Sequence, residues 1–201
     1  MNRIVALLIM SLVASTAFAQ KYTPGYYYTK SGEKVDGLLR FNFIAGIVDD
    51  KSDGKCSVSF KKSKKDDKTV LTTRDICCFV IKGDSFAIIK DIEPKAGLFN
   101  STYPQDFAKV IEVGKINLYK YYSFISNGQF SYTLEEWIVE RDGKQEKLTQ
   151  LHFEDQMAEF VGDYPALLER VKRNQLTYSN AKDDTRAIIK FYNEWAKMVP
   201  K

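Results

Sequence analysis

An alternation of apolar and polar residues runs through most of the chain between Gly25 and Leu151, and it limits the folds that the chain can adopt. In the segment Val35–Phe43 the odd-numbered positions are apolar or glycine, and the even-numbered positions are polar except for Leu38. The same alternation recurs in Cys56–Phe60. A period of two places successive side chains on opposite faces, which is typical of a half-buried β-strand.

Short turns rich in glycine and asparagine separate these strand-like runs. The turns are Ser31-Gly32, Asp53-Gly54, Lys82-Gly83-Asp84, Asn127-Gly128 and Asp142-Gly143. Glycine and asparagine tolerate the positive φ that tight hairpins require, so the strands are expected to pair antiparallel. The expected strands are Gly25–Lys30, Lys34–Phe43, Lys55–Lys61, Thr69–Thr73, Ile76–Ile81, Phe86–Ile92, Phe107–Glu112, Lys115–Phe124, Phe130–Glu140 and Gln145–Leu151. About ten strands at this spacing predict a barrel, a sandwich or two small sheets packed together.

After Glu154 the apolar residues follow a helical period instead. Short helices are predicted over Asp155–Val161 and Pro165–Arg173, with Asp163 as the N-cap of the second. A longer third helix follows, with one apolar stripe made by Ile188, Tyr192, Trp195 and Val199. We therefore expect a mainly β chain of the α+β class. It would have an antiparallel barrel or sandwich over residues 20–152 and two or three helices packed on it over residues 153–201.

Residues 1–19 have the composition of a Sec-type signal peptide. A positively charged start at Arg3 precedes the apolar run Ile4–Val13, and Ala17–Ala19 supplies small residues for cleavage. The run is too short to span a bilayer, which takes about 20 apolar residues. Because Gln20 and not a cysteine would follow the cleavage site, no lipid anchor is expected. The mature chain is predicted to lie in the periplasm or outside the cell, without a transmembrane segment.

The charge balance of the chain is nearly neutral. Its formal net charge is +4, and removal of residues 1–19 lowers this by one because Arg3 is lost and no acid is. Proteins dedicated to nucleic acid usually carry a strong basic excess. Together with export, this balance argues against a nucleic-acid partner.

Three cysteines, Cys56, Cys77 and Cys78, remain after cleavage, so at most one disulfide can form within the chain. Neighbouring strand residues point to opposite faces, so only one of the adjacent pair could meet Cys56. A Cys56–Cys77 bridge is the candidate disulfide. The alternative, three small residues of the core, is favoured because nothing else suggests a disulfide scaffold. With a single histidine, His152, and no C-x-x-C pair, no metal site is expected.

The sequence lacks the common catalytic signatures. It has no nucleophile elbow, no paired-histidine zinc motif, no phosphate-binding glycine loop and no calcium loop, and no cofactor is expected. Neighbouring carboxylates occur at Glu135-Glu136, Asp66-Asp67 and Asp183-Asp184. Glycoside hydrolysis would need two carboxyl groups that face one another, which adjacent strand residues do not. A non-catalytic role is therefore favoured, and enzymatic activity is left open.

Tyrosines are the first of two features that suggest binding. Tyr119 and Tyr121 share one face of a predicted strand, and Tyr26 and Tyr28 do the same near the mature N-terminus. Exposed rings on a sheet would form a flat platform for sugars or a protein partner. The alternative, which is favoured, is that tyrosine is a good strand former on a half-buried surface.

A cluster of lysines is the second feature. Lys61, Lys62, Lys64 and Lys65 lie in one predicted hairpin, close to Asp66 and Asp67. Such a run is usually a solvated hairpin tip. Outside the cytoplasm, however, a basic loop could also contact anionic lipid head groups or an acidic polysaccharide.

Four segments of the chain resemble uncharacterised exported proteins of Bacteroidetes-type bacteria. They are Tyr28–Leu38, Gly114–Lys120, Asp163–Leu167 and Phe191–Asn193. The resemblance implies a periplasmic or cell-surface setting and brings no known activity or catalytic residue.

We therefore expect an exported binding or envelope-associated protein, with a glycan or an envelope protein as its partner. The alternatives are a small hydrolase of envelope or dietary polysaccharide and a structural subunit that docks a protein. The oligomeric state is left open.

Overall fold

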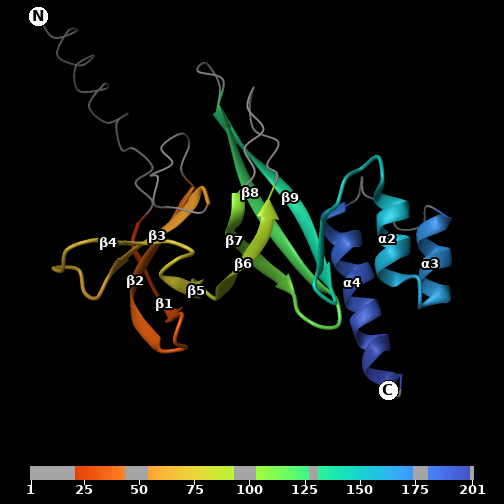
Figure 1. Ribbon diagram of the computed structural model, residues 1–201, viewed down its shortest axis with the longest axis horizontal. Helices are drawn as coiled ribbons and strands as arrows, with labels where there is room; N and C mark the ends of the chain where they lie inside the picture. The colour runs from red at the N-terminus through yellow and green to blue at the C-terminus, as the bar shows by residue number, and fades with distance from the viewer. Residues whose placement is uncertain (1–20, 44–53, 93–102, 127–130, 174–180, 200–201) are drawn as a thin grey trace, which may run out of the picture.

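The computed structural model describes residues 21–43, 54–92, 103–126, 131–173 and 181–199. In these residues the chain forms ten β-strands followed by three α-helices (Figure 1). The strands are β1 (Thr23–Thr29), β2 (Lys34–Phe43), β3 (Cys56–Lys61), β4 (Thr69–Leu71), β5 (Ile76–Ile81), β6 (Asp84–Ile92), β7 (Tyr103–Glu112), β8 (Asn117–Ser126), β9 (Ser131–Arg141) and β10 (Lys144–Lys147). The helices are α2 (Phe153–Val161), α3 (Pro165–Lys172) and α4 (Ala181–Met198). The predicted signal peptide and the Asn127-Gly128 turn lie outside the described residues.

All ten described strands belong to one antiparallel sheet in the order β10-β9-β8-β7-β6-β5-β1-β2-β3-β4. The predicted strand-rich class and the antiparallel pairing are therefore confirmed. The predicted barrel or sandwich is wrong, because the strands form a single sheet that stays open, with β4 and β10 at its two edges.

Two hairpins of the sheet follow the predicted turn chemistry closely. Ile81 pairs with Asp84 and Arg141 with Lys144, so each loop has two residues, Lys82-Gly83 and Asp142-Gly143. All four loop residues have positive φ, between 52° and 84°. Positive φ at both loop positions defines the type I′ turn, whose twist matches that of the flanking strands.

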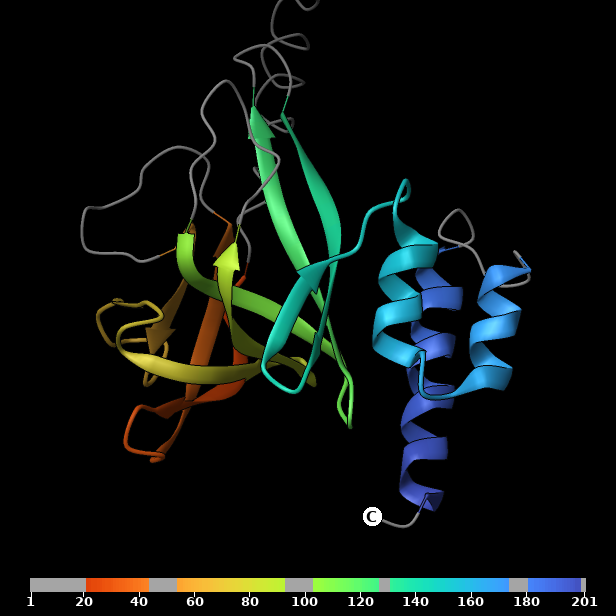
Figure 2. The same ribbon diagram turned by 45° about the vertical axis from the view of Figure 1, so that its right-hand side comes forward.

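The sheet curls strongly, so that β2 contacts β8 and β3 contacts β7 across its concave side. Figure 2 shows the strands bending around this common interior. The interior is filled by apolar and aromatic side chains, among them Leu39, Val58, Phe79 and Phe107, each of which is fully buried. Within the described residues, side-chain hydrogen bonds and not a further strand pairing join the parts that the curl brings together.

The first of these joints is a buried carboxylate, which we call the Asp106 hub. Each oxygen of Asp106 accepts two hydrogen bonds. Oδ1 accepts from the N–H of Cys56 (3.0 Å) and of Phe107 (2.8 Å), and Oδ2 accepts from the N–H of Lys55 (3.0 Å) and the hydroxyl of Tyr121 (2.8 Å). Burial raises the pKa of Asp106, and these hydrogen bonds, that of Tyr121 first, act to lower it. The hub thereby ties β7 and β8 to the start of β3.

The second joint is made by Gln145 of β10. Its side-chain oxygen accepts a hydrogen bond from the N–H of Lys90 (3.2 Å), and its amide nitrogen donates to the carbonyl of Lys90 (2.9 Å). One amide side chain thus satisfies both backbone groups of a residue on β6, as a neighbouring strand would.

The three helices lie together on the side of β9 away from β1–β4 (Figures 1 and 2). There they form a second core, to which Leu118 of β8, Val139 of β9, Met157 of α2 and Ile188 of α4 contribute fully buried side chains. β8 and β9 are therefore covered on both faces, by the concave core on one side and by the helices on the other. Within the described residues, no helix is both long enough and apolar enough to span a membrane.

The predicted stripe of α4 faces this second core along only part of its length. Ile188 and Tyr192 are buried and Trp195 is half-buried, whereas Val199 is 44% exposed.

Asn193 of α4 is also buried. Its side chain accepts a hydrogen bond from the N–H of Ile116 and donates one to the carbonyl of the same residue, both at 2.8 Å. This bracket fixes α4 to the β7–β8 hairpin in the same way that Gln145 fixes β10 to β6.

The sequence predicts Asp163 as the N-cap of α3, and this prediction is wrong. The N-cap residue of α3 is Tyr164, which makes no side-chain capping hydrogen bond. Asp163 instead accepts two hydrogen bonds from the guanidinium of Arg141, at 3.0 and 2.7 Å, and one from the hydroxyl of Tyr192, at 2.8 Å. A bidentate partner satisfies both carboxylate oxygens at once, so it outcompetes a single backbone N–H. The cluster joins β9, the α2–α3 turn and α4.

This cluster predicts a specific acid sensitivity. The Arg141 hydrogen bond lowers the pKa of Asp163 below its usual value of 3.8. A carboxyl group with a lowered folded-state pKa stabilises the fold above its unfolded pKa, and the contribution is lost as the pH falls through the folded value. We expect the free energy of unfolding to fall more between about pH 5 and about pH 2 in the wild type than in Asp163→Asn. Urea denaturation at several pH values would measure this, and parallel pH profiles would contradict it.

Candidate functional site

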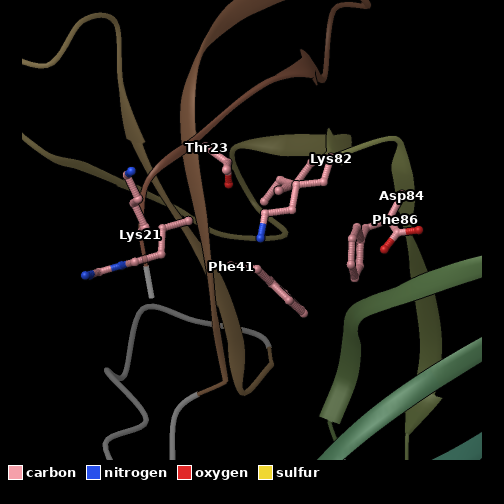
Figure 3. A pocket seen from close by; sticks show the side chains of 8 residues that line it. Lys21, Thr23, Phe41, Lys82, Asp84 and Phe86 are labelled. Atoms are coloured by element: carbon pink, nitrogen blue, oxygen red, sulfur yellow. The ribbon is translucent and has the colours of Figure 1, made fainter. Parts of the chain in front are cut away.

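The candidate site is a hollow of about 260 Å³ beside the start of β1, which we call the basic pocket (Figure 3). Its lining residues are Lys21, Thr23, Arg40, Phe41, Ile81, Lys82, Asp84 and Phe86. They come from the beginning of β1, the middle of β2 and the β5–β6 hairpin. The curl of the sheet brings these segments together.

The β5–β6 turn positions one of the cations. Lys82 occupies the first loop position of the type I′ turn, with φ of 55°, where most residues other than glycine and asparagine are disfavoured. Figure 3 shows its ammonium group directed into the space between Thr23 and the rings of Phe41 and Phe86. A conformation that is unfavourable for lysine thus holds a charge over the pocket.

The cations of the pocket lack acidic partners. Among the described residues, no carboxylate forms an ion pair with Lys21, Arg40 or Lys82. The one carboxylate of the lining, Asp84, is already paired with Lys109 of β7, whose ammonium nitrogen lies 2.7 Å from it. Three cationic residues without acidic partners therefore line the pocket, against one compensated carboxylate, and this local excess of positive charge favours an anionic ligand. Only the ammonium group of Lys82 is directed at the rings, because that of Lys21 points away from them in Figure 3 and Arg40, as the neighbour of Phe41 on β2, faces the other side of the strand.

Arg40 is held in place by neutral groups. Its Nε donates to the side-chain oxygen of Asn42 at 3.0 Å, and Nη2 lies 3.5 Å from the hydroxyl of Ser59. Its guanidinium also lies 5.1 Å from the ring centre of Tyr22, and the ammonium group of Lys61 lies 5.6 Å from the same ring. These contacts orient the guanidinium without neutralising it, and they bring Lys61 next to the charges of the pocket.

Aromatic rings provide the apolar part of the pocket. The ring centres of Phe41 and Phe86 lie 4.8 Å apart, and Phe86 stacks on the fully buried Phe79 at 4.6 Å. The rings belong to the concave core, so their positions are fixed by packing. A ligand in the pocket would meet these fixed rings and the ammonium group of Lys82, while Lys21 and Arg40 add positive charge at the edge of the pocket.

A second hollow, of about 540 Å³, lies beside the C-terminal half of α4 and is mainly apolar. Its polar side chains already serve the fold, because Asp163 is held by Arg141 and Asn193 brackets Ile116. Trp195 in its wall stacks on Tyr164 at 4.6 Å. This hollow therefore offers shape but few polar groups to a ligand, and the basic pocket is the better candidate.

The predicted tyrosine platform on β8 is wrong. Tyr121 is fully buried and belongs to the Asp106 hub, and Tyr119 is 8% exposed with its hydroxyl donating to Glu140 at 2.7 Å. Burial is the largest cause that raises the pKa of both phenols. Both rings face the concave core, and the sequence alone could not show that the curl of the sheet encloses this face of β8.

Tyr26 and Tyr28 share one face of β1, as predicted, but they are half-buried. Their rings meet edge to face with centres 5.8 Å apart, and the ammonium of Lys34 lies 4.2 Å from the ring centre of Tyr26. Of the predicted lysine cluster, Lys62, Lys64 and Lys65 are exposed in the β3–β4 connection, whereas Lys61 reaches Tyr22. Neither tyrosine lines the basic pocket.

The candidate Cys56–Cys77 disulfide is not formed, because all three cysteines are free. Cys56 faces the concave core on β3, and burial raises the pKa of its thiol. Cys77 lies on β5, and two strands, β1 and β2, separate it from β3 in the sheet. The two residues are too far apart along the sheet for a disulfide, which needs Cα atoms within about 7 Å.

The neighbouring carboxylates do not converge on a site. Glu135 pairs with Lys120 at 3.2 Å, while Glu136 is buried and accepts from the hydroxyl of Ser123 at 2.5 Å and pairs with Lys147 at 3.2 Å. Asp66 and Asp67 are exposed in the β3–β4 connection, and the side chain of Asp183 lies outside the described residues. Among the described side chains, the groups gathered at a pocket are thus cations and aromatic rings, and the neighbouring carboxylates do not form an acid and base pair.

Comparison with protein families, with characterised proteins and with solved structures finds no match to this chain. The chemistry of the basic pocket therefore has to be argued from its own residues.

Proposed function

We propose that the chain is an exported, non-catalytic binding protein whose basic pocket takes one acidic sugar residue of an envelope or extracellular polysaccharide. The observation that carries the proposal is the ammonium group of Lys82, which has no acidic partner among the described residues and lies beside the rings of Phe41 and Phe86. The cationic residues Lys21 and Arg40 also belong to the lining and add positive charge around it. A carboxylate on a sugar would pair with these cations. Its apolar C–H groups would lie on the aromatic rings.

The remaining features of the site agree with this ligand class. The volume of about 260 Å³ suits one sugar ring and not a folded peptide. The hydroxyl of Thr23 lies in the lining, where it donates to the carbonyl of Leu39 at 3.5 Å and can accept from a sugar hydroxyl. The export setting is supported by the signal-peptide composition of residues 1–19 and by the resemblance to exported bacterial proteins.

The experiment is a calorimetric titration of the chain with D-glucuronate, with D-glucose as the neutral control. Cationic side chains at a partly open surface bind a single anion weakly, so a dissociation constant of about 1 mM is expected. Binding should weaken as the salt concentration rises, because salt screens exposed charges. Binding of glucose as tight as that of glucuronate, or no binding of glucuronate at low salt, would contradict the proposal.

A matched pair of variants tests whether the pocket is responsible. Lys82→Gln removes one charge from the pocket, and Lys30→Gln removes the same charge at the other end of β1, about 20 Å away along the strand. We expect Lys82→Gln to weaken glucuronate binding about tenfold, which corresponds to one charge-assisted contact, and Lys30→Gln to leave it unchanged. Equal losses in both variants would show a general charge effect and not a site.

A further inference from the structure

The two adjacent cysteines of β5 have an arrangement that strand geometry does not ordinarily allow. Neighbouring residues on a strand point to opposite faces. Here the sulfur atoms of Cys77 and Cys78 lie only 3.4 Å apart. The prediction that they face opposite ways is wrong, and the reason lies in the pairing of β5 with β1.

A β-bulge places both cysteines on one face. Tyr28 pairs with Cys78 while the next residue, Thr29, pairs with Ile76, so Cys77 is an extra residue in the ladder. The burial pattern shows the same insertion, because Ile76 and Phe79 both face the concave core although three positions separate them. An extra residue at a bulge re-aims its side chain, here toward that of its neighbour.

The pair is accessible, in contrast to the third cysteine. Cys77 and Cys78 are half-buried, and the thiol of Cys77 lies 3.5 Å from the carbonyl oxygen of Tyr28, to which it can donate. Cys56 is 3% exposed and lies on the concave side of the sheet. An external reagent would therefore meet the adjacent pair first.

We propose that Cys77 and Cys78 form a disulfide with each other when the chain meets a disulfide oxidant. The thiolate of one cysteine attacks the oxidant R–S–S–R, releases R–S⁻ and forms a mixed disulfide. The thiolate of the other cysteine then attacks the protein sulfur of that mixed disulfide and releases the second R–S⁻. In sum the two thiols lose two electrons and two protons, and one R–S–S–R is reduced to two R–SH.

The resulting bond would be strained and easy to reduce. Consecutive Cα atoms are 3.8 Å apart, which is shorter than the usual range for bridged cysteines, and distorted disulfides are the more reducible ones. The bond would also leave the chain without an exposed thiol, since the remaining Cys56 is buried. An exported chain with three cysteines would thus avoid forming disulfides with other chains. This reaction requires only the oxidant, so it does not depend on the proposed sugar binding.

The test is intact-mass measurement of the purified, reduced chain after exposure to oxidised glutathione. We expect the loss of two hydrogen masses without retained glutathione, and a peptide in which Cys77 and Cys78 resist alkylation until a mild reductant is added. A stable glutathione adduct on the wild-type chain, a bridge to Cys56 or a disulfide-linked dimer would each overturn the proposal.

Three single variants make the assignment specific. Cys56→Ser should lose two hydrogen masses as the wild type does. Cys77→Ser and Cys78→Ser should each retain one glutathione instead, because the resolving thiol is missing. If Cys56→Ser abolished the intramolecular product, or if either of the other variants still formed one, the pairing of Cys77 with Cys78 would be wrong.

Discussion

Replacing Asp106 with asparagine is expected to lower the free energy of unfolding by about 3–5 kcal/mol, the largest effect of any single substitution that we predict. The carboxylate is fully buried, and its two oxygens accept four hydrogen bonds from Lys55, Cys56, Phe107 and Tyr121. An asparagine of the same shape must place an NH₂ group where one oxygen was. In either orientation that group would face two donors, which would lose their acceptor in a buried site.

Chemical denaturation of the wild type and of three variants measures this effect. Tyr121→Phe removes one of the four donors and is expected to cost about 1 kcal/mol. Asp36→Asn makes the same chemical change at an exposed position, where Asp36 pairs with Lys34 on the surface, and should cost less than about 1 kcal/mol. If Asp106→Asn were no more destabilising than Asp36→Asn, the hub would not be the joint between β7 and β3 that we describe.

The second large effect is expected at Asn193, the bracket between α4 and the β7–β8 hairpin. Asn193→Ala leaves the N–H and the carbonyl of Ile116 without their side-chain partner in a buried site, at a cost of about 2–4 kcal/mol. Asn117→Ala is the matched control, because its side chain also accepts a backbone hydrogen bond, from Gly114 at 3.2 Å, but at the surface. It should cost less than about 1 kcal/mol.

A double-mutant cycle with Gly114 sharpens this test. A methyl group at Gly114 would lie 2.4 Å from the side chain of Asn193, so Gly114→Ala should destabilise the wild type by displacing the bracket. In the Asn193→Ala background that obstacle is absent, and the same substitution should cost much less. The two changes should therefore be strongly non-additive. Additive costs would show that the close approach of Gly114 and Asn193 does not matter for stability.

The local elements of the fold could be predicted because each depends on residues close in sequence. The alternation in β2 and the type I′ turn at Asp142-Gly143 are properties of short segments, and both agree with the structure. The helical period after Glu154 likewise marks α2, α3 and α4. The bulge at Cys77 could not be predicted, because it exists only in the register between β5 and β1.

The candidate site could be predicted only in fragments. The lysine cluster that begins at Lys61 indicates a basic hairpin, whereas the sequence marks Lys82-Gly83 only as a turn and Arg40 only as a polar position of an alternating strand. No spacing in the sequence relates Arg40 to Lys82, which lie 42 positions apart. Tyr119 and Tyr121, for which the sequence left a binding role open, belong to the interior because the sheet curls and their face of β8 lines the concave core.

The sequence by itself determined the strands, the tight turns and the helices of this protein, because alternation, turn chemistry and helical period act over a few residues. The tertiary structure decided that the sheet stays open and curls. It also decided that Asp106, Gln145 and Asn193 join distant parts of the chain and that the Lys82 turn lies over aromatic rings from β2 and β6. These outcomes depend on which faces are covered after packing, and a side chain's hydrogen-bond partners far along the chain leave no local pattern.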